Sequence, residues 1–494
     1  MPKTIMKRFT VLSLALLAIV LGACSQQQES SSKHTGTAHA EPAKTEKIKN
    51  NIKLSKSTGV VRNKVSFTVN QLEPNQPYQL KWTEVEGRYK LKDAHQFIGA
   101  DYAVKEKQIL QGKSDENGGW RGSFTVPVGF GGDHTIYVTS GNKKIGQANF
   151  YVNPSFSISP KSGAVGSEIT IKAEGIGWGT YESNWQLTYD NKFTGMLSAV
   201  STNGTAEAKI RAAGPFGKHT LTIWHGYLGF PYVNHQQAPN SYLPVPSFTF
   251  NVTDGKPEAK DHVESVPEAA DGGAKMAKLK QQPGVNVTLD KRAGTVGEPV
   301  QLKASGLPKD KDIDLIWNTI AGSRITKAGF SKKTAKLATV HTDSNGALSA
   351  SFKVPNDLGG IPHLIELKLG GKSYGQAYLR VLPSIVDISP KSGPVGTNIK
   401  ITINGGGWTE FDNAYYLTYD NAYVGYMCAF NSQGTVTFTV KAFGEKGYHL
   451  IDLYPGIYKG KQKQPDIYDI PQLTYLKDHP GSAMPAIRLG FTVE

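Results

Sequence analysis

The chain repeats itself at a constant spacing, and this repeat constrains its fold more than any other feature. The segment Ile158-Ser-Pro-Lys-Ser-Gly163 returns as Ile388-Ser-Pro-Lys-Ser-Gly393, 230 positions later. The string Leu-Thr-Tyr-Asp-Asn occupies 187–191 and again 417–421, at the same offset. Because repeats of this length mark a structural unit that is used more than once, one fold must serve both copies.

A second pair of repeated segments precedes the first. Trp82 matches Trp317, and Phe124-Thr-Val-Pro127 matches Phe352-Lys-Val-Pro355, at offsets of 235 and 228. The mature chain is therefore predicted to hold two copies of a two-domain unit. We name the expected domains A1 (55–152), B1 (153–253), A2 (285–382) and B2 (383–494), with a linker over 254–284 that is rich in Lys, Glu, Ala, Asp and Pro.

Strand-like segments run through the repeated units. Apolar and polar residues alternate in Ile169-Thr-Ile171, Thr220–Trp224, Ile399–Ile403 and Val436–Val440, which is the period of a half-buried strand. Pairs such as Asn117-Gly118 lie between such segments and favour tight turns. No stretch of the mature chain has a convincing helical period. The sequence therefore predicts an all-β fold of four immunoglobulin-like β-sandwich domains in two duplicated pairs.

Two motifs carry a family resemblance. The B units share Ile-Ser-Pro-x-Ser-Gly-x-Val-Gly, then Ile-x-Ile, then Gly-x-Gly-Trp, and in this they resemble the immunoglobulin-like IPT/TIG domains. The A units, with Asp-x-x-Gly, Phe-x-Val-Pro and a His before an alternating strand, resemble related bacterial immunoglobulin-like modules. The resemblance implies the sandwich fold and little about function, since such sandwiches carry many unrelated activities.

The first 24 residues have the order of a bacterial export signal. Three basic residues within the first eight precede the apolar run Phe9–Leu21, which is too short to cross a bilayer as a helix. The string Leu21-Gly22-Ala23-Cys24 resembles the lipobox of bacterial lipoproteins, which implies cleavage before Cys24 and its acylation. An ordinary signal with an incidental cysteine is the alternative. We expect a signal peptide over 1–23, a flexible tether over 24–54, and a protein lipid-anchored at the cell membrane and facing outside the cytoplasm.

Long aromatic loops before the last strand of each B domain are the first candidate site. Loops of this length are commonly functional or disordered, and rings among amide and charged neighbours suit sugar stacking or a protein partner. Exposed rings would indicate binding, whereas buried rings would indicate that the loops only pack domains together. The candidate ligand-binding residues are Trp224, His225, Tyr227, Tyr232, Tyr242, Tyr454, Tyr458, Tyr468 and Tyr475.

A basic run in A2 is the second candidate site. The formal net charge of the chain is +14, which permits an anionic partner. An exported lipoprotein meets anionic lipids and wall polymers before nucleic acid, so nucleic acid is not an expected partner. A solvated loop is the alternative interpretation. The candidate anionic-polymer contacts are Arg324, Lys327, Lys332, Lys333 and Lys336.

No catalytic or metal-binding constellation stands out in the sequence. Gly371-Lys-Ser373-Tyr-Gly375 has the form of a nucleophile elbow, but it falls between two strand-like segments rather than before a helix. The strand-start histidines of the repeated units are expected to make structural hydrogen bonds. A zinc site at His225 and His235 is a minor alternative, because the repeat counterpart of His225 is Pro455. We expect no enzyme activity, no metal and no cofactor.

The sequence thus favours a non-enzymatic cell-envelope lipoprotein that acts as a surface binding or adhesion protein. Its partner would be a glycan, an anionic wall polymer or another protein. The alternative is a structural spacer or assembly component of the cell surface without a small ligand. Exposure of the loop rings separates the two hypotheses.

Overall fold

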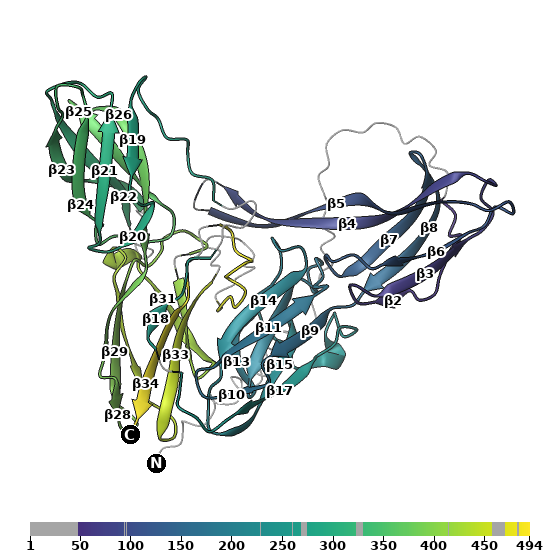
Figure 1. Ribbon diagram of the computed structural model, residues 1–494. Coiled ribbons are helices and arrows are strands. Elements are labelled where there is room, and N and C mark those ends of the chain that lie inside the picture. Colours follow the sequence, from purple (N-terminus) through teal and green to yellow (C-terminus); the bar gives the residue numbers. More distant parts are fainter. Residues whose placement is uncertain are drawn as a thin grey trace, which may run out of the picture. The chain divides into compact units, whose positions relative to one another are not determined.

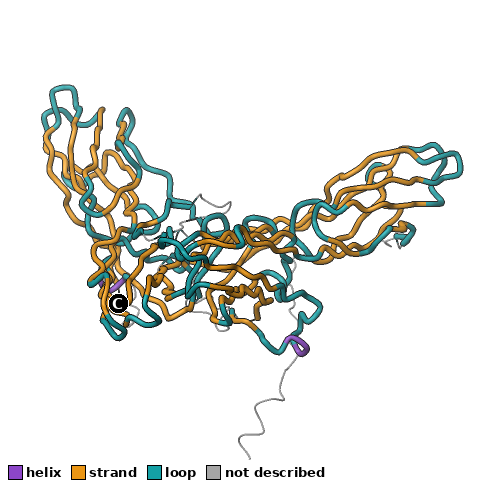
Figure 2. The backbone as a smooth tube through the Cα atoms, turned by 60° about the horizontal axis from the view of Figure 1, so that its bottom comes forward, coloured by secondary structure: helices purple, strands orange, loops and turns teal. Residues whose placement is uncertain are grey.

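The computed structural model describes residues 48–494, apart from 93, 95, 228, 259, 268–273, 323–329, 413, 457–469 and 482–483. The described part is all-β, as the sequence predicts (Figures 1 and 2). Its helical elements are two short 3-10 turns, η1 (His235–Gln237) and η2 (Phe430–Ser432). The expected signal peptide, Cys24 and most of the expected tether lie outside the described residues.

The A1 segment forms a sandwich of two sheets. Apolar side chains from both sheets, such as Phe67 and Ile136, pack in one buried cluster around Trp82. The smaller sheet has the order β1 (Ile52–Leu54), β3 (Lys64–Val69), β6 (Trp120–Thr125). The larger sheet has the order β2 (Thr58–Gly59), β8 (Lys143–Val152), β7 (Gly132–Ser140), β4 (Pro77–Lys92), β5 (Gln96–Lys113).

The A2 segment repeats this arrangement. Trp317 takes the place of Trp82 in its buried cluster. The smaller sheet has the order β19 (Asn286–Leu289), β21 (Pro299–Ser305), β24 (Leu348–Lys353). The larger sheet has the order β20 (Ala293–Thr295), β26 (Lys372–Leu382), β25 (His363–Leu369), β22 (Asp312–Gly322), β23 (Phe330–His341).

The B1 segment forms a second type of sandwich. Its smaller sheet has the order β14 (Thr205–Arg211), β11 (Glu168–Glu174), β9 (Ser155–Ser159). Its larger sheet has the order β10 (Ser162–Gly163), β17 (Ser247–Val252), β15 (Gly217–Tyr227), β12 (Asn184–Tyr189), β13 (Lys192–Ser198), and β16 (Phe230–Pro231) pairs with β15. Strand β13 is therefore an edge strand.

The B2 segment repeats the strand order of B1, except that a strand from the linker is added at one edge of its larger sheet. The smaller sheet has the order β27 (Ser384–Ser389), β29 (Asn398–Asn404), β32 (Val436–Lys441). The larger sheet has the order β18 (His262–Val263), β34 (Ile487–Val493), β33 (Gly447–Pro455), β30 (Ala414–Tyr419), β31 (Ala422–Cys428), and β28 (Ser392–Gly393) pairs with β34. Its edge strand β31 is the repeat counterpart of β13.

The duplication read from the sequence is also present in the strand register. Ile171 pairs with Ile158 between β11 and β9, and Ile401 pairs with Ile388 between β29 and β27, which keeps the offset of 230. The Ser–Pro bond of each Ile-Ser-Pro motif is cis in both copies. Equivalent sequence positions therefore occupy equivalent structural positions in the two B units.

The strand-start histidines have structural hydrogen bonds, which confirms the sequence prediction. In the A units, both ring nitrogens of His134 face backbone carbonyls, and the ring stacks on Trp82 at 4.4 Å. His363 repeats this arrangement on Trp317. In the B units, His219 and His449 each contact an aspartate and a backbone carbonyl. Each ring thus supports the start of a strand.

The predicted linker is hydrogen-bonded to the two domains of the second half of the chain, A2 and B2. Its β18 pairs with β34 in B2. The backbone N–H of Ala274 donates to Pro480 O at 3.0 Å, and Gln281 Nε2 donates to Gln376 O at 2.7 Å. The described linker residues therefore contribute hydrogen bonds to both B2 and A2.

Candidate functional site

The predicted B1 loop residues divide between packing and exposure. His225 is fully buried, and Trp224 donates its ring N–H to Thr188 Oγ1 at 3.0 Å. Tyr232 is half-buried, and Tyr227 ends β15. Tyr242 is exposed, yet its ring contacts Tyr151 of A1 edge-on.

Tyr242 is tied to A1 through one shared acceptor. The hydroxyls of Tyr242 and Tyr151 donate to the same oxygen of Glu182, at 2.5 and 3.1 Å. Burial and the hydrogen bond to Glu182 raise the pKa of Tyr242 to about 12. The hydroxyl end of this ring therefore serves the A1–B1 contact, and only the rest of the ring is available to a ligand.

The predicted B2 loop rings that the structure describes are buried. Tyr454 and Tyr475 have 0% and 1% of their surface exposed, and their rings contact each other edge-on. Tyr458 and Tyr468 lie outside the described residues. Because a buried ring offers no face to a ligand, Tyr454 and Tyr475 pack domains together, as the alternative interpretation expected.

The described lysines of the predicted basic run do not share one face of their strand. Lys332, Lys333 and Lys336 are exposed on the edge strand β23. Successive strand residues point to opposite faces, so Lys333 lies on the other face from Lys332 and Lys336. Lys336 is also paired with Asp314 at 2.8 Å. Arg324 and Lys327 lie outside the described residues.

The two B1 loop histidines bond to each other rather than converging on an open metal position. His225 Nε2 lies 2.7 Å from His235 Nδ1. Burial, and then the neighbouring His235, lower the pKa of His225. Among the described residues, no group of three or more His, Cys, Asp and Glu side chains is arranged to hold a metal ion.

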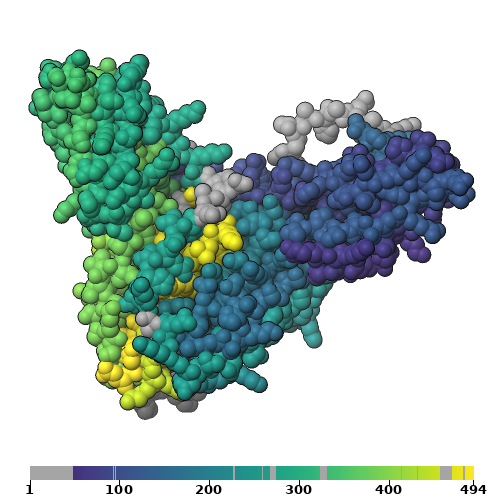
Figure 3. Space-filling model, viewed as in Figure 1, coloured from purple at the N-terminus to yellow at the C-terminus, as the bar shows by residue number. Residues whose placement is uncertain are grey.

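B1 and B2 share an interface along their edge strands. Strands β13 and β31 contact each other, and the B2 segment before β34 runs beside β13. Met196 N donates to Pro471 O and Leu473 N donates to Met196 O, both at 2.8 Å. In Figure 3 this C-terminal segment (yellow) lies against B1 residues (blue to teal). The B2 loop thus extends the B1 sheet by a short bridged segment.

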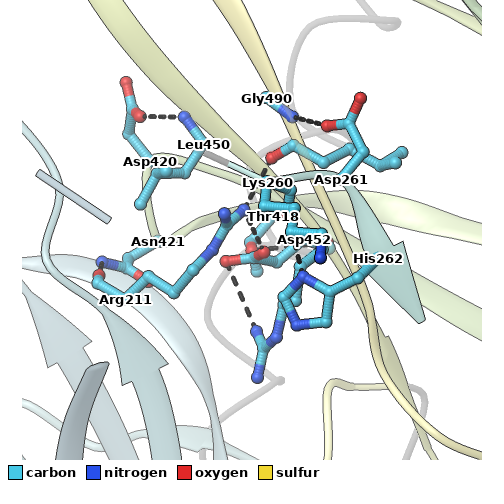
Figure 4. A network of polar contacts seen from close by, with 12 residues as sticks. Arg211, Lys260, Asp261, His262, Thr418, Asp420, Asn421, Leu450, Asp452 and Gly490 are labelled. Atoms are coloured by element: carbon cyan, nitrogen blue, oxygen red, sulfur yellow. Dashed lines mark hydrogen bonds and ion pairs between the residues drawn. The ribbon is translucent and has the colours of Figure 1, made fainter. Parts of the chain in front are cut away.

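A buried charge network fixes this interface (Figure 4). Arg211 of B1 reaches Asp452 of B2 at 2.5 Å, and Arg488 approaches the other oxygen of Asp452 at 3.4 Å. The linker residue Glu264 pairs with Arg488 at 2.7 Å. Asn421 Nδ2 donates to Arg211 O at 2.8 Å. Since buried charges are tolerated only when they are paired, these partners determine how B1 and B2 meet.

Sequence reasoning missed this network, although a signal was present. Asp452 interrupts the apolar strand Leu450–Tyr454, and Arg488 interrupts Ala486–Phe491. Their repeat counterparts in B1 are uncharged, as Thr222 shows for Asp452. A charged residue inside an apolar strand of one copy alone indicates a partner that the other copy lacks.

A series of aromatic rings in contact with one another crosses the same interface, and the rings at its two ends are exposed. Phe193 of β13 contacts Phe230 at 5.3 Å and Tyr423 of β31 at 6.1 Å between ring centroids. Tyr423 contacts the buried Tyr416, which in turn contacts Tyr426. Phe230 and Tyr426, at the two ends, are each 52% exposed. We call these five residues the aromatic strip.

The aromatic strip is a product of the duplication. Phe193 and Tyr423 are repeat counterparts at the offset of 230, and they meet because β13 and β31 are equivalent edge strands. Exposed rings with neighbouring apolar residues, such as Val424 at 58% exposure, are typical of interaction surfaces. The strip residues on β30 and β31 lie outside the loops before the last strands, which were the predicted site, and no sequence pattern singled them out.

A polar cavity of about 530 Å³ lies where A1, B1 and the B2 loop meet. Arg62 contacts Glu174, and both Lys172 and Lys477 lie near Glu207, at 3.5 and 3.6 Å. The remaining charged residue of the lining, Asp478, accepts backbone hydrogen bonds from Val200 and Ser201. The lining adds hydroxyl side chains of Ser155, Ser157, Thr202, Thr205 and Thr474. Such a cavity suits an uncharged polar group better than an anionic polymer.

The long A1 hairpin β4–β5 reaches both B units. The Gly87 N–H donates to Asn203 Oδ1 of B1 at 2.8 Å, and the Tyr89 hydroxyl donates to Asp478 of B2 at 3.0 Å. The Phe97 N–H donates to Glu410 of B2 at 2.9 Å. A1 therefore contacts both B units through this hairpin and stabilises the B1–B2 interface.

The structure also places two potentially reactive features of the sequence, the Gly371–Gly375 string and Cys428. The Gly371–Gly375 string begins in the turn between β25 and β26 and continues into β26, so it lies between two strands, as expected. Cys428 is half-buried at the end of β31. No helix within the described ranges combines the length and apolar character required to cross a bilayer.

Comparison with protein families identifies one segment. Residues 383–460 match the IPT/TIG domain, which confirms the expected resemblance for the B2 unit. No curated protein matches the chain.

Solved structures give remote likenesses only. A mutant of Salmonella alpha-2-macroglobulin matches 88% of this chain at 8% identity with a TM-score of 0.18, and this chain covers 30% of its length. FdeC, an Escherichia coli adhesin, matches 67% of this chain and 96% of its own at 12% identity and a TM-score of 0.17. A putative membrane-anchored protein from Corynebacterium diphtheriae matches 67% and 89% at 12% identity and a TM-score of 0.16. Scores this low carry no argument about the function of this chain.

Proposed function

We propose that this chain is a non-enzymatic envelope lipoprotein, anchored through Cys24, that binds a cell-surface glycan on the aromatic strip. The aromatic strip is the observation that supports this proposal. Its rings contact one another across two domains, and the rings at both ends are half-exposed. Aromatic rings offer flat apolar faces on which the C–H faces of sugar rings can stack. The buried Arg211–Asp452 pair joins the same two domains, which keeps the rings in a fixed arrangement.

The geometry favours a glycan over an anionic wall polymer. The described lysines of the A2 run lie on opposite faces of β23, and the charges of the polar cavity are paired. Neither arrangement provides a row of free cations for successive phosphates. Stacking on the strip does not depend on charge, so binding should change little with salt.

The experiment measures sedimentation of the chain from residue 25 on with isolated envelope polysaccharide, across a salt series. We expect binding that persists at high salt. The double variant F230A/Y426A should weaken it by at least about tenfold, because each ring contributes on the order of 1 kcal/mol or more through stacking. V233A, at a residue 73% exposed in the same loop as Phe230, is the matched control and should bind like the parent.

The spacer hypothesis gives a different result. If the chain binds no envelope fraction at any salt concentration, the loops and rings serve packing alone, as Tyr454 and Tyr475 already do. Binding that disappears with salt and is unaffected by F230A/Y426A would instead place the site on a charged surface.

A further inference from the structure

In three of the four sandwiches, a second segment of the chain is hydrogen-bonded to the last strand of the larger sheet. In A1, Gln147 N of β8 donates to Lys49 O at 3.0 Å, and in A2, Gln282 N donates to Tyr374 O of β26 at 2.8 Å. In B2, the linker strand β18 pairs antiparallel with β34. Among the described residues, no such segment lies beside the middle of β17 in B1, where the two-residue strand β10 pairs only with the end of the strand.

The linker segment at B2 is held by backbone and by charge. Glu264 N donates to Ala486 O at 2.9 Å, just before β34. One oxygen of Asp261 accepts the Gly490 N–H at 3.1 Å, and the other oxygen pairs with Lys391 Nζ at 2.8 Å. A single carboxylate therefore joins the docked segment both to the strand and to a lysine beside it.

The last strands of the two B units correspond residue by residue. Thr249 pairs with Thr220 between β17 and β15, and Gly490 pairs with Leu450 between β34 and β33. Thr220 and Leu450 are themselves counterparts at the repeat offset of 230. Thr249 therefore takes the place in B1 that Gly490 takes beside the docked segment of B2.

The outer side of β17 presents the groups that B2 uses. Asn251 N donates to Lys161 O at 2.9 Å on this side, and alternate residues of a strand direct their N–H groups the same way, so the N–H groups of Ser247 and Thr249 also face outward. Both residues are exposed, and no described segment pairs with them there. Lys161, the counterpart of Lys391, is exposed and makes no ion pair with a described residue.

Strand β17 also lacks the charges by which exposed edges avoid pairing. Its sequence, Ser-Phe-Thr-Phe-Asn-Val, contains no charged residue and no proline. The edge strands β5 and β23 of the A units, in contrast, each carry several charged residues. Charged side chains on an edge strand prevent unwanted strand addition, so an uncharged edge in the same chain is typical of a strand that accepts a partner.

We propose that the outer edge of β17 binds an extended acidic segment of a partner protein by strand addition. The segment lies antiparallel to β17, as β18 lies to β34, and its carboxylate pairs with Lys161 and accepts the Thr249 N–H. Main-chain hydrogen bonds to an exposed sheet edge are an established means of peptide recognition. The B2 edge supports this assignment, because the same fold there already holds such a segment through Asp261.

Two observations favour a peptide segment over other occupants. The outward N–H and C=O groups of a strand need alternating acceptors and donors at strand spacing, which a polymer of phosphates does not provide. A second copy that paired its own β17 with this edge would bring no carboxylate for Lys161, because β17 contains no acidic residue. An acidic extended segment satisfies both the backbone and the lysine.

The test uses the chain from residue 25 on, which retains the whole compact unit Ile48–Glu494, and a synthetic peptide with the sequence of residues 260–267 as the probe. At saturating peptide, hydrogen exchange at Ser247 and Thr249 should slow at least about fivefold, because their N–H groups gain acceptors. Binding of the fluorescently labelled peptide, followed by anisotropy, should weaken at least about tenfold when its aspartate is replaced by asparagine.

Two charge reversals form a matched pair in the protein. K161E should weaken peptide binding at least about tenfold, since it places a carboxylate opposite the carboxylate of the peptide. K218E removes an exposed lysine of the neighbouring strand β15 and changes the net charge equally, yet it should bind the peptide like the parent. Unchanged thermal unfolding of K161E verifies that its fold is intact.

The remaining controls separate this proposal from the proposed function. F230A/Y426A should bind the peptide like the parent, and K161E should keep its glycan binding, so either proposal can fail alone. The proposal is overturned if the peptide leaves exchange at Ser247 and Thr249 unchanged, or if K161E and K218E bind it equally well. It is also overturned if both amides are protected without peptide in a chain that sediments as a dimer, because a second copy then occupies the edge.

Discussion

Asp452 is the residue on which the contact between the two halves depends most. Its side chain is buried between Arg211 and Arg488, both of which are themselves buried. Two cations in such a position are tolerable only because a carboxylate lies between them. The stability of the interface therefore rests on a few buried charges as well as on apolar area.

Replacing Asp452 by Asn should destabilise the protein strongly. The amide keeps the shape but leaves two buried guanidinium groups without their shared carboxylate, which costs about 3–5 kcal/mol. Urea unfolding should show this loss in the transition that includes B1 and B2. E86Q, which removes an exposed pair between Glu86 and Lys105, is the control and should cost less than about 1 kcal/mol. Equal effects of the two variants would contradict a structural role for the network.

His449 makes stability depend on pH. Burial alone would lower its pKa, but the hydrogen bond and charge of Asp420, with the carbonyl of Glu445, outweigh it and raise the pKa above the ordinary value. The folded protein thus binds this proton more tightly than the unfolded chain. The resulting stability is present in full below about pH 6.5 and is lost as pH rises through the raised pKa.

D420N should remove that pH-dependent contribution. The melting temperature of the parent should exceed that of the variant by more at pH 6 than at pH 9, as thermal denaturation would show. D312N, in the exposed pair of Asp312 with His341, should change the melting temperature little at either pH. A difference between parent and D420N that is constant with pH would show that Asp420 acts only as a neutral hydrogen-bond acceptor.

At the scale of elements, edge strands decide how the copies meet. Strand β13 accepts the segment around Gln472 as a short additional bridge, and Gly195 permits this approach. A Cβ at Gly195 would lie 2.7 Å from Pro471 O and 2.9 Å from Leu473 Cγ, whereas the repeat counterpart Gly425 has open space around it. The duplicated strands have thus acquired different neighbours.

This difference provides a matched pair of variants. G195A should force the Pro471–Leu473 segment away from β13 and destabilise the protein by about 1–3 kcal/mol. G425A should be close to neutral in the same unfolding measurement. Hydrogen exchange at Met196 and Leu473 should increase in G195A alone. If both variants behave alike, the segment does not depend on close packing against β13.

The individual strands could be predicted from the sequence, but their contacts across domains could not. Alternation in Ile169–Ile171 and Ile399–Ile403 indicated the strands, because a half-buried strand imposes a period of two on its own residues. The meeting of Phe193 with Tyr423 depends on the packing of two edge strands far apart in sequence, which no local pattern encodes. The loop rings were ambiguous for the same reason: an aromatic residue suits burial, as at Tyr475, as well as exposure, as at Phe230.

At the scale of the whole molecule, the repeat offset predicted two similar halves but not how they join. The composition of residues 254–284 indicated only a linker, whereas the structure binds its described residues to B2 and A2 through contacts such as Glu264 with Arg488. Charged residues in a linker look solvated until their buried partners are known. The sequence predicted a site on single loops. In the structure, the candidate site lies instead on surfaces that form only when B1 and B2 are joined.

Hydroxyl-radical footprinting of the intact chain, with and without isolated envelope polysaccharide, tests the central claim most directly. We expect oxidation of Phe230 and Tyr426 to fall when the polysaccharide is present. Oxidation of Phe216 and Phe443, which are exposed outside the aromatic strip, should stay unchanged. Unchanged oxidation of Phe230 and Tyr426 under conditions where the chain is bound would contradict the account, because the ligand would then contact another surface.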